Sequence, residues 1–138
     1  MNYSLQNLTQ VADCNVLLAM ATKEKANLTF KKMSDERMTA RFTETSLELD
    51  AALQGVIAEL SAIETIINML PDGPSKDDAM DKKVRLEYKK FTIENRRETY
   101  GTVALIEKEM DLARVNQELN EVDNFISAVE IRKSELDA

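Results

Sequence analysis

The stretch "LPDGPS" at residues 70–75 contains both prolines of the chain and one of its three glycines. Proline lacks the backbone N–H that a helix interior needs, and glycine reaches backbone angles that other residues avoid. Ser75 stands where the N-cap of a following helix belongs. The stretch therefore predicts a turn at 71–75 that separates a first arm at about 4–70 from a second arm at about 76–137.

The two arms have the composition of helices. Each arm holds one glycine, Gly55 or Gly101, and no proline. The chain is rich in Ala, Leu, Glu, Lys, Met and Arg, residues that lose little side-chain freedom in a helix. Its 138 residues are enough for one hydrophobic core but not for two independent ones. The sequence predicts a single all-α domain over residues 1–138.

Apolar residues recur in both arms at alternating steps of four and three. In the first arm the series is Leu49, Leu53, Val56, Leu60, Ile63, Ile67 and Leu70. In the second arm, interrupted only at Lys108 and Lys133, it is Leu105, Leu112, Val115, Leu119, Val122, Ile126, Val129 and Leu136. This spacing keeps one helix face toward a partner helix and is typical of a coiled coil.

The charge distribution predicts how the arms meet. If the chain reverses at the turn, residues whose numbers add to about 146 lie side by side. Segment 44–64 carries five acidic residues and no basic one, whereas segment 82–102 carries seven basic residues and three acidic ones. Attraction between these segments disfavours other registers, although each exposed pair contributes little alone. A long antiparallel, coiled-coil-like helical hairpin is the predicted fold.

The apolar surface beside the turn is wider than one partner helix covers. A two-stranded seam uses two positions per heptad, so a wider stripe suits a multi-helix bundle. On the facing segment the seam spacing selects Met80, Val84, Tyr88 and Phe91. We therefore expect the hairpin to form a homodimer that is a four-helix bundle. The candidate interface residues are Leu17, Leu18, Met20, Ile57, Ile66 and Ile67.

A compact monomeric up-down four-helix bundle is the alternative fold. Poor helix formers, including Thr39, Thr43 and Ser46, gather in the first arm, and Gly101 lies opposite them by the same arithmetic. A break at this level in both arms would convert two long helices into four shorter ones. Charge pairing is the same in both folds, so it does not separate them.

The side chains most often used for catalysis are scarce. The chain has no histidine and one cysteine, Cys14, so the commonest general base and zinc ligand is missing and no thiolate cage can form within one chain. No glycine-rich phosphate loop is present. Carboxylates at helical spacing fit a solvated helix face. The sequence predicts a protein that is not an enzyme and holds no metal or cofactor.

The net charge of −7 argues against a general nucleic-acid binder, so nucleic acid is not an expected partner. One basic run stands out, and its candidate residues are Lys82, Lys83, Lys89, Lys90, Arg96 and Arg97. We expect this run to pair with the acidic segment of the first arm, because Tyr88 and Phe91 fall on the seam spacing. No apolar run is long enough to span a membrane, and a lone cysteine suits a cytoplasmic protein.

Three functions fit these features. The leading hypothesis is a non-enzymatic interaction or scaffold protein that acts through self-association and an exposed apolar helix face, with a further protein partner as a possibility. The second is a small acidic holding or export chaperone, since seven methionines could form an adaptable surface. The third is a weak binder of nucleic acid or an anionic surface through residues 82–97.

Overall fold

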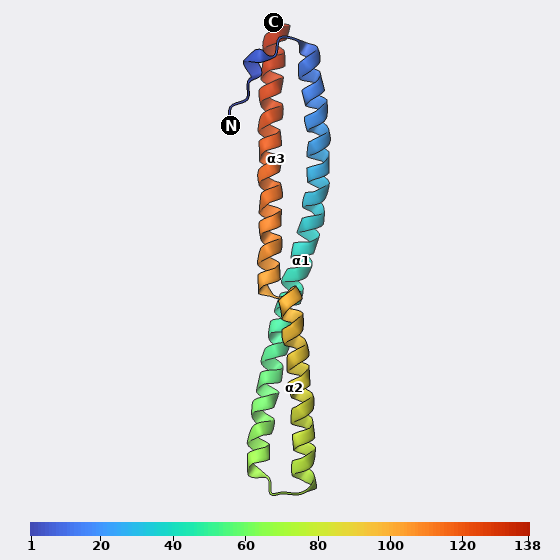
Figure 1. The fold of residues 1–138 in the computed structure, drawn as a ribbon, viewed down its shortest axis with the longest axis vertical. Coiled ribbons are helices and arrows are strands. Elements are labelled where there is room, and N and C mark those ends of the chain that lie inside the picture. The colour runs from blue at the N-terminus through green and yellow to red at the C-terminus, as the bar shows by residue number, and fades with distance from the viewer. The chain divides into compact units, whose positions relative to one another are not determined.

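The computed structural model describes residues 1–138. A short 3-10 helix, η1 (Leu5–Asn7), precedes three α-helices (Figure 1). These are α1 (Val11–Met69), α2 (Pro74–Tyr100) and α3 (Thr102–Asp137). The chain contains no strand, which confirms the all-α class. None of the helices combines the length and the apolar character that crossing a membrane requires.

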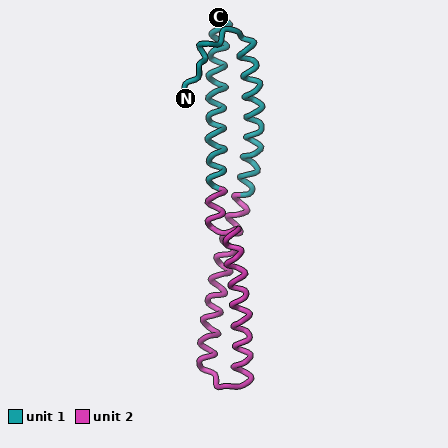
Figure 2. The backbone as a smooth tube through the Cα atoms, viewed as in Figure 1, with its two compact units in different colours: residues 1–38, 109–138 teal, residues 39–108 magenta.

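The chain divides into two compact units (Figure 2). Unit 1 comprises residues 1–38 and 109–138, and unit 2 comprises residues 39–108. In unit 1 the first part of α1 runs antiparallel to most of α3, and in unit 2 the rest of α1 runs antiparallel to α2 (Figure 1). That the units form a single domain stays a prediction.

Ion pairs between facing helices confirm the register that charge predicts. In unit 1, Lys25 Nζ lies 2.8 Å from Asp123 Oδ1. In unit 2, Lys83 Nζ lies 3.5 Å from Glu64 Oε1, and Arg97 Nε lies 3.3 Å from Asp50 Oδ1. The residue numbers of each pair add to 147 or 148, close to the expected 146.

One set of buried residues in α1 recurs at multiples of seven. In unit 1 it comprises Cys14, Ala21 and Leu28, and in unit 2 it comprises Leu49, Val56 and Ile63, with Ser46 and Leu53 buried at the alternating seam position. The unit 2 residues pack against Ala79, Leu86 and Ile93 of α2. In α3 the fully buried positions are Val115 and Val129, while the other apolar members of its predicted series are partly buried. The apolar series predicted for both arms therefore face the interior.

The predicted seam of α2 is wrong. Met80, Val84, Tyr88 and Phe91 are exposed, and the buried face is the one that carries Ala79, Leu86 and Ile93. The positions that alternate with these three are Lys83 and Lys90, whose stems are half-buried while their amines reach Glu64 and Glu94. Because lysines occupy half of the true seam, counting apolar residues selects the outer face of the helix.

Helix boundaries differ from the prediction at two places. The first arm is predicted to begin near residue 4, but α1 begins at Val11. Helix α2 starts at Pro74, so the N-cap is Gly73 rather than Ser75. Gly73 has φ 153°, a left-handed backbone angle that glycine adopts freely, and proline is favoured in the first turn because its missing N–H is not needed there.

Only the second arm is interrupted at the level where both arms have weak helix formers. Helix α1 continues through residues 34–46 without a break. The second arm breaks at Gly101, whose N–H donates to the carbonyl oxygen of Arg97 at 2.8 Å. A Cβ atom at this position would overlap that oxygen, so the close approach requires glycine. On the facing helix, the hydroxyl oxygen of Ser46 lies 3.4 Å from the hydroxyl oxygen of Thr102.

Candidate functional site

Two surface features of this chain are built like binding sites, and the first is the outer face of α2. This α2 outer face consists of Met80, Val84, Tyr88 and Phe91, which recur at steps of four, four and three and so share one side of the helix. Tyr88 is 71% exposed and Phe91 is 58% exposed. Aromatic side chains bury large areas when they bind and dominate interface energetics, so this row is a candidate binding surface.

Half of the basic candidates serve the fold. Lys83 and Arg97 pair with Glu64 and Asp50 across unit 2, and Lys90 pairs with Glu94 one turn ahead at 3.6 Å. The other half, Lys82, Lys89 and Arg96, are exposed and make no ion pair, and Arg85 is likewise free. The expectation that the whole run pairs with the acidic segment is therefore correct for Lys83 and Arg97 and wrong for Lys82, Lys89, Lys90 and Arg96.

The candidate interface residues fall into two groups. Leu17, Leu18 and Ile67 are partly buried within their own units, and Ile67 packs against the cluster of Ile63, Ala79 and Leu86. Met20, Ile57 and Ile66 are exposed. The structure thus leaves three of the six available to a partner. Met20 belongs to unit 1, and Ile57 and Ile66 belong to unit 2.

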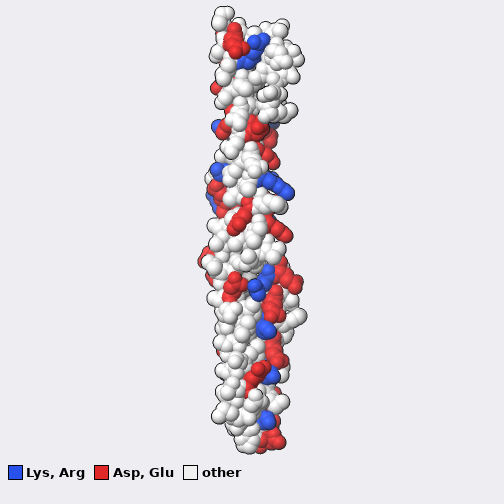
Figure 3. Space-filling model, turned by 90° about the vertical axis from the view of Figure 1, so that its left-hand side faces the viewer, with Lys and Arg blue, Asp and Glu red and all other residues white.

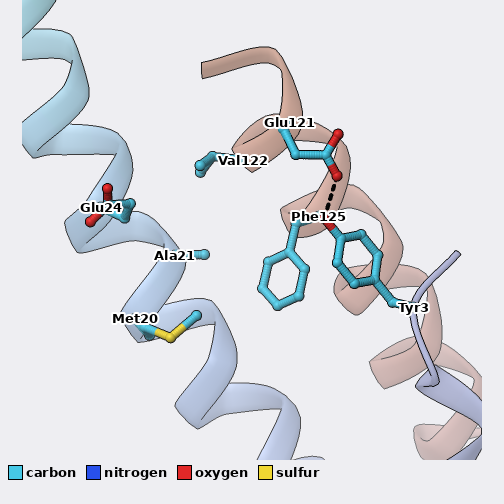
Figure 4. A pocket seen from close by; sticks show the side chains of 7 residues that line it. All are labelled: Tyr3, Met20, Ala21, Glu24, Glu121, Val122 and Phe125. Carbon is cyan, nitrogen blue, oxygen red and sulfur yellow. Dashed lines mark hydrogen bonds between the residues drawn. The ribbon is translucent and has the colours of Figure 1, made fainter. Parts of the chain in front are cut away.

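The second feature is a groove in unit 1 between α1 and α3, seen close up in Figure 4. We call it the unit 1 groove, and its volume is about 160 Å³. It is lined by Tyr3, Met20, Ala21, Glu24, Glu121, Val122 and Phe125. The floor is apolar, while one carboxylate from each helix stands at its edge. A groove of this size and composition suits a single apolar side chain next to a positive charge.

The N-terminal segment forms one wall of this groove. Tyr3 donates a hydrogen bond from its hydroxyl to Glu121 and stacks edge-on against Phe125, with ring centroids 5.0 Å apart (Figure 4). This hydrogen bond, together with burial and the negative charge of Glu121, raises the pKa of Tyr3 above its ordinary value of 10.0. Arg132 holds the same segment by donating from Nη2 to the Leu8 carbonyl oxygen at 2.7 Å.

Sequence reasoning does not find the unit 1 groove. Met20 is a candidate on apolar grounds, but Tyr3 and Glu121 lie 118 residues apart and share no motif. The signal available in the sequence is the place of Phe125, which stands next to the apolar series of α3 rather than in it. A contact between a non-helical terminus and a distant helix face has no periodic signature.

Acidic and basic side chains are interleaved on the face that Figure 3 shows. No group of three or more Cys, Asp or Glu residues is arranged to hold a metal ion. Comparison with known protein families, curated proteins and solved structures finds no match.

Proposed function

We propose that this chain is a non-enzymatic interaction protein that binds other protein surfaces through exposed apolar helix faces. The observation that carries the proposal is the α2 outer face. Its rings lie on the side of α2 away from the buried positions Ala79, Leu86 and Ile93, so they do not stabilise the hairpin. An exposed aromatic row that the fold does not use supports this proposal, because aromatic residues are enriched among the anchors of protein interfaces.

Binding by the α2 outer face is tested with the full chain in a pull-down followed by affinity measurement on the recovered partner. We expect Tyr88→Ser combined with Phe91→Ser to abolish recovery, because each ring is an interface anchor. Phe30→Ser is the matched control, since Phe30 is a 76% exposed aromatic residue in unit 1. Equal recovery by the wild type and the double variant would reject this assignment.

A holding chaperone is the second candidate, and the methionines favour it. All seven are exposed, including Met33, Met38 and Met69, which is unusual for side chains that normally fill cores. Flexible thioether side chains adapt to different apolar clients. Suppression of aggregation of a model client at equal stoichiometry is the expected result, and an unchanged light-scattering curve would count against this function.

Binding to an anionic surface or to nucleic acid is the third candidate. The sequence discounts it by placing Tyr88 and Phe91 in the seam, but both are exposed. They stand beside Arg85 and Lys89, which make no ion pair. Retention on heparin or on vesicles containing anionic lipid should then fall steeply with added salt. Flow-through at low salt would exclude it.

A further inference from the structure

The unit 1 groove and the α2 outer face are complementary to each other in size and in charge. We propose that the groove of one molecule binds the α2 outer face of a second copy of this chain, with Tyr88 as the side chain that enters it. This inference rests on the proposed function, because it names the partner of the same exposed face. It makes the protein self-associating through two different surfaces.

Size supports Tyr88 as the occupant. A cavity of about 150 Å³ accommodates one benzene ring, so the 160 Å³ groove has room for one aromatic side chain. Met20 and Phe125 supply a flexible thioether and a ring edge, both of which pack favourably against an aromatic face. Tyr88 is the most exposed member of the α2 outer face, so it can enter without unfolding its helix.

Charge supports the same pairing. The groove presents Glu24 and Glu121, and no basic side chain lines it. Arg85 lies one helical turn before Tyr88 on the same side of α2, and Lys89 follows Tyr88 directly. Of the acidic residues on this helix, Glu87 and Glu94 are already paired with Lys83 at 3.9 Å and Lys90 at 3.6 Å, whereas Asp81, one turn before Arg85, makes no ion pair. Within one turn of Tyr88 the α2 outer face therefore carries the free positive charges of Arg85 and Lys89, and the groove carries the negative charges of Glu24 and Glu121.

Such a contact joins unlike surfaces, and each molecule carries one of each. A heterologous contact of this kind generates either a closed ring or an open chain of molecules. Association should therefore depend on concentration and weaken with added salt, because exposed charges guide it. Sedimentation velocity of the wild-type chain over a concentration series at low and high salt measures both effects.

Two charge-reversal variants separate the two surfaces. The groove variant is Glu24→Lys, which touches no ion pair of the fold. The α2 variant is Arg85→Glu with Lys89→Glu, which also breaks none. We expect each to weaken self-association about tenfold or more, because like charges then face each other. Glu118→Lys, an exposed charge reversal on α3 outside the groove, should leave association unchanged.

Mixing the two variants gives the decisive measurement. The α2 variant keeps an intact groove and the groove variant keeps an intact α2, so an equimolar mixture should form a two-chain complex that neither variant forms alone. Helical circular dichroism equal to the wild type shows that both variants are folded. A mixture that stays monomeric, or a Glu118→Lys control that loses association equally, would overturn the proposal.

The same measurements distinguish this inference from the proposed function. If the wild type is monomeric at every concentration yet Tyr88→Ser with Phe91→Ser loses a recovered protein partner, then the α2 outer face binds a different protein and self-docking is wrong. If the wild type is monomeric and is retained by a polyanion, then the face binds an anionic ligand and self-docking is again wrong. If the mixture of the two variants recovers association, that result supports both self-docking and the proposed interaction function.

Discussion

Substituting Gly101 by alanine should destabilise the protein, although alanine is the better helix former. The Cβ atom that alanine adds at this position would overlap the carbonyl oxygen of Arg97, which accepts the N–H of residue 101 at 2.8 Å. Relieving the overlap requires the backbone to move. Weakening that hydrogen bond costs about 1 kcal/mol of stability, and the backbone strain costs about 1–3 kcal/mol more. Against this, alanine lowers the entropy of the unfolded chain by about 0.4–1 kcal/mol. We expect a net loss of about 1–3 kcal/mol.

The control for this prediction is the glycine in the other arm. Gly55 lies within α1, and a Cβ atom there would meet nothing within 4 Å. Gly55→Ala should therefore raise the free energy of unfolding by about 0.5–1 kcal/mol. Urea denaturation followed by helical circular dichroism measures both variants under one set of conditions. If Gly101→Ala were as stable as Gly55→Ala, the steric reason given for the break would be refuted.

Three further predictions concern single side chains. Asp35 has a buried carboxylate oxygen without a hydrogen-bond partner, so Asp35→Leu should raise the free energy of unfolding by about 1–3 kcal/mol, against less than about 0.5 kcal/mol for exposed Arg37→Leu. The absorbance titration of the wild type, after subtraction of the titration of Tyr3→Phe, should show a Tyr3 pKa above 10.0, and Glu121→Gln should lower that pKa. The Tyr3–Glu121 contact stabilises the fold below pH 10, and its contribution is lost as the pH rises through the raised pKa. Cys14 is 0% exposed, so a thiol reagent should modify it only at the rate of unfolding.

The parts of the fold that the sequence predicts are those with strong periodic or charge signals. The series from Leu49 to Leu70 is apolar at both seam positions of every heptad, so its buried face can be counted directly. The pairing of segments 44–64 and 82–102 follows from opposite charge, and Lys83 with Glu64 and Arg97 with Asp50 confirm it. The apolar spacing is a local signal, and the charge pattern compares only two segments, so both can be found in a single sequence.

The candidate sites are harder to predict because they depend on which face of a helix is left over. On α2 the apolar spacing is real, but it marks the outer face, since Lys83 and Lys90 occupy the inner one with their stems. The same error conceals the exposure of Tyr88 and Phe91. For the unit 1 groove, the position of Tyr3 follows from a folded-back terminus held by Arg132, which no helical period encodes.

The break at Gly101 also has a reason in the register of the second arm. Its buried positions run through Ala79, Leu86 and Ile93 at steps of seven, and continue through Val115 and Val129, again in multiples of seven. From Ile93 to Val115 the count is 22, one more than three heptads. One extra residue rotates a continuous helix face by about 100°, which would turn the α3 seam away from its partner. Ending α2 at Tyr100 and starting α3 at Thr102 absorbs that residue, and glycine is the residue small enough to allow the close backbone approach at the junction. The break is therefore the consequence of a one-residue insertion in the heptad pattern, and α1, whose buried positions keep one register from Cys14 to Ile63, needs none.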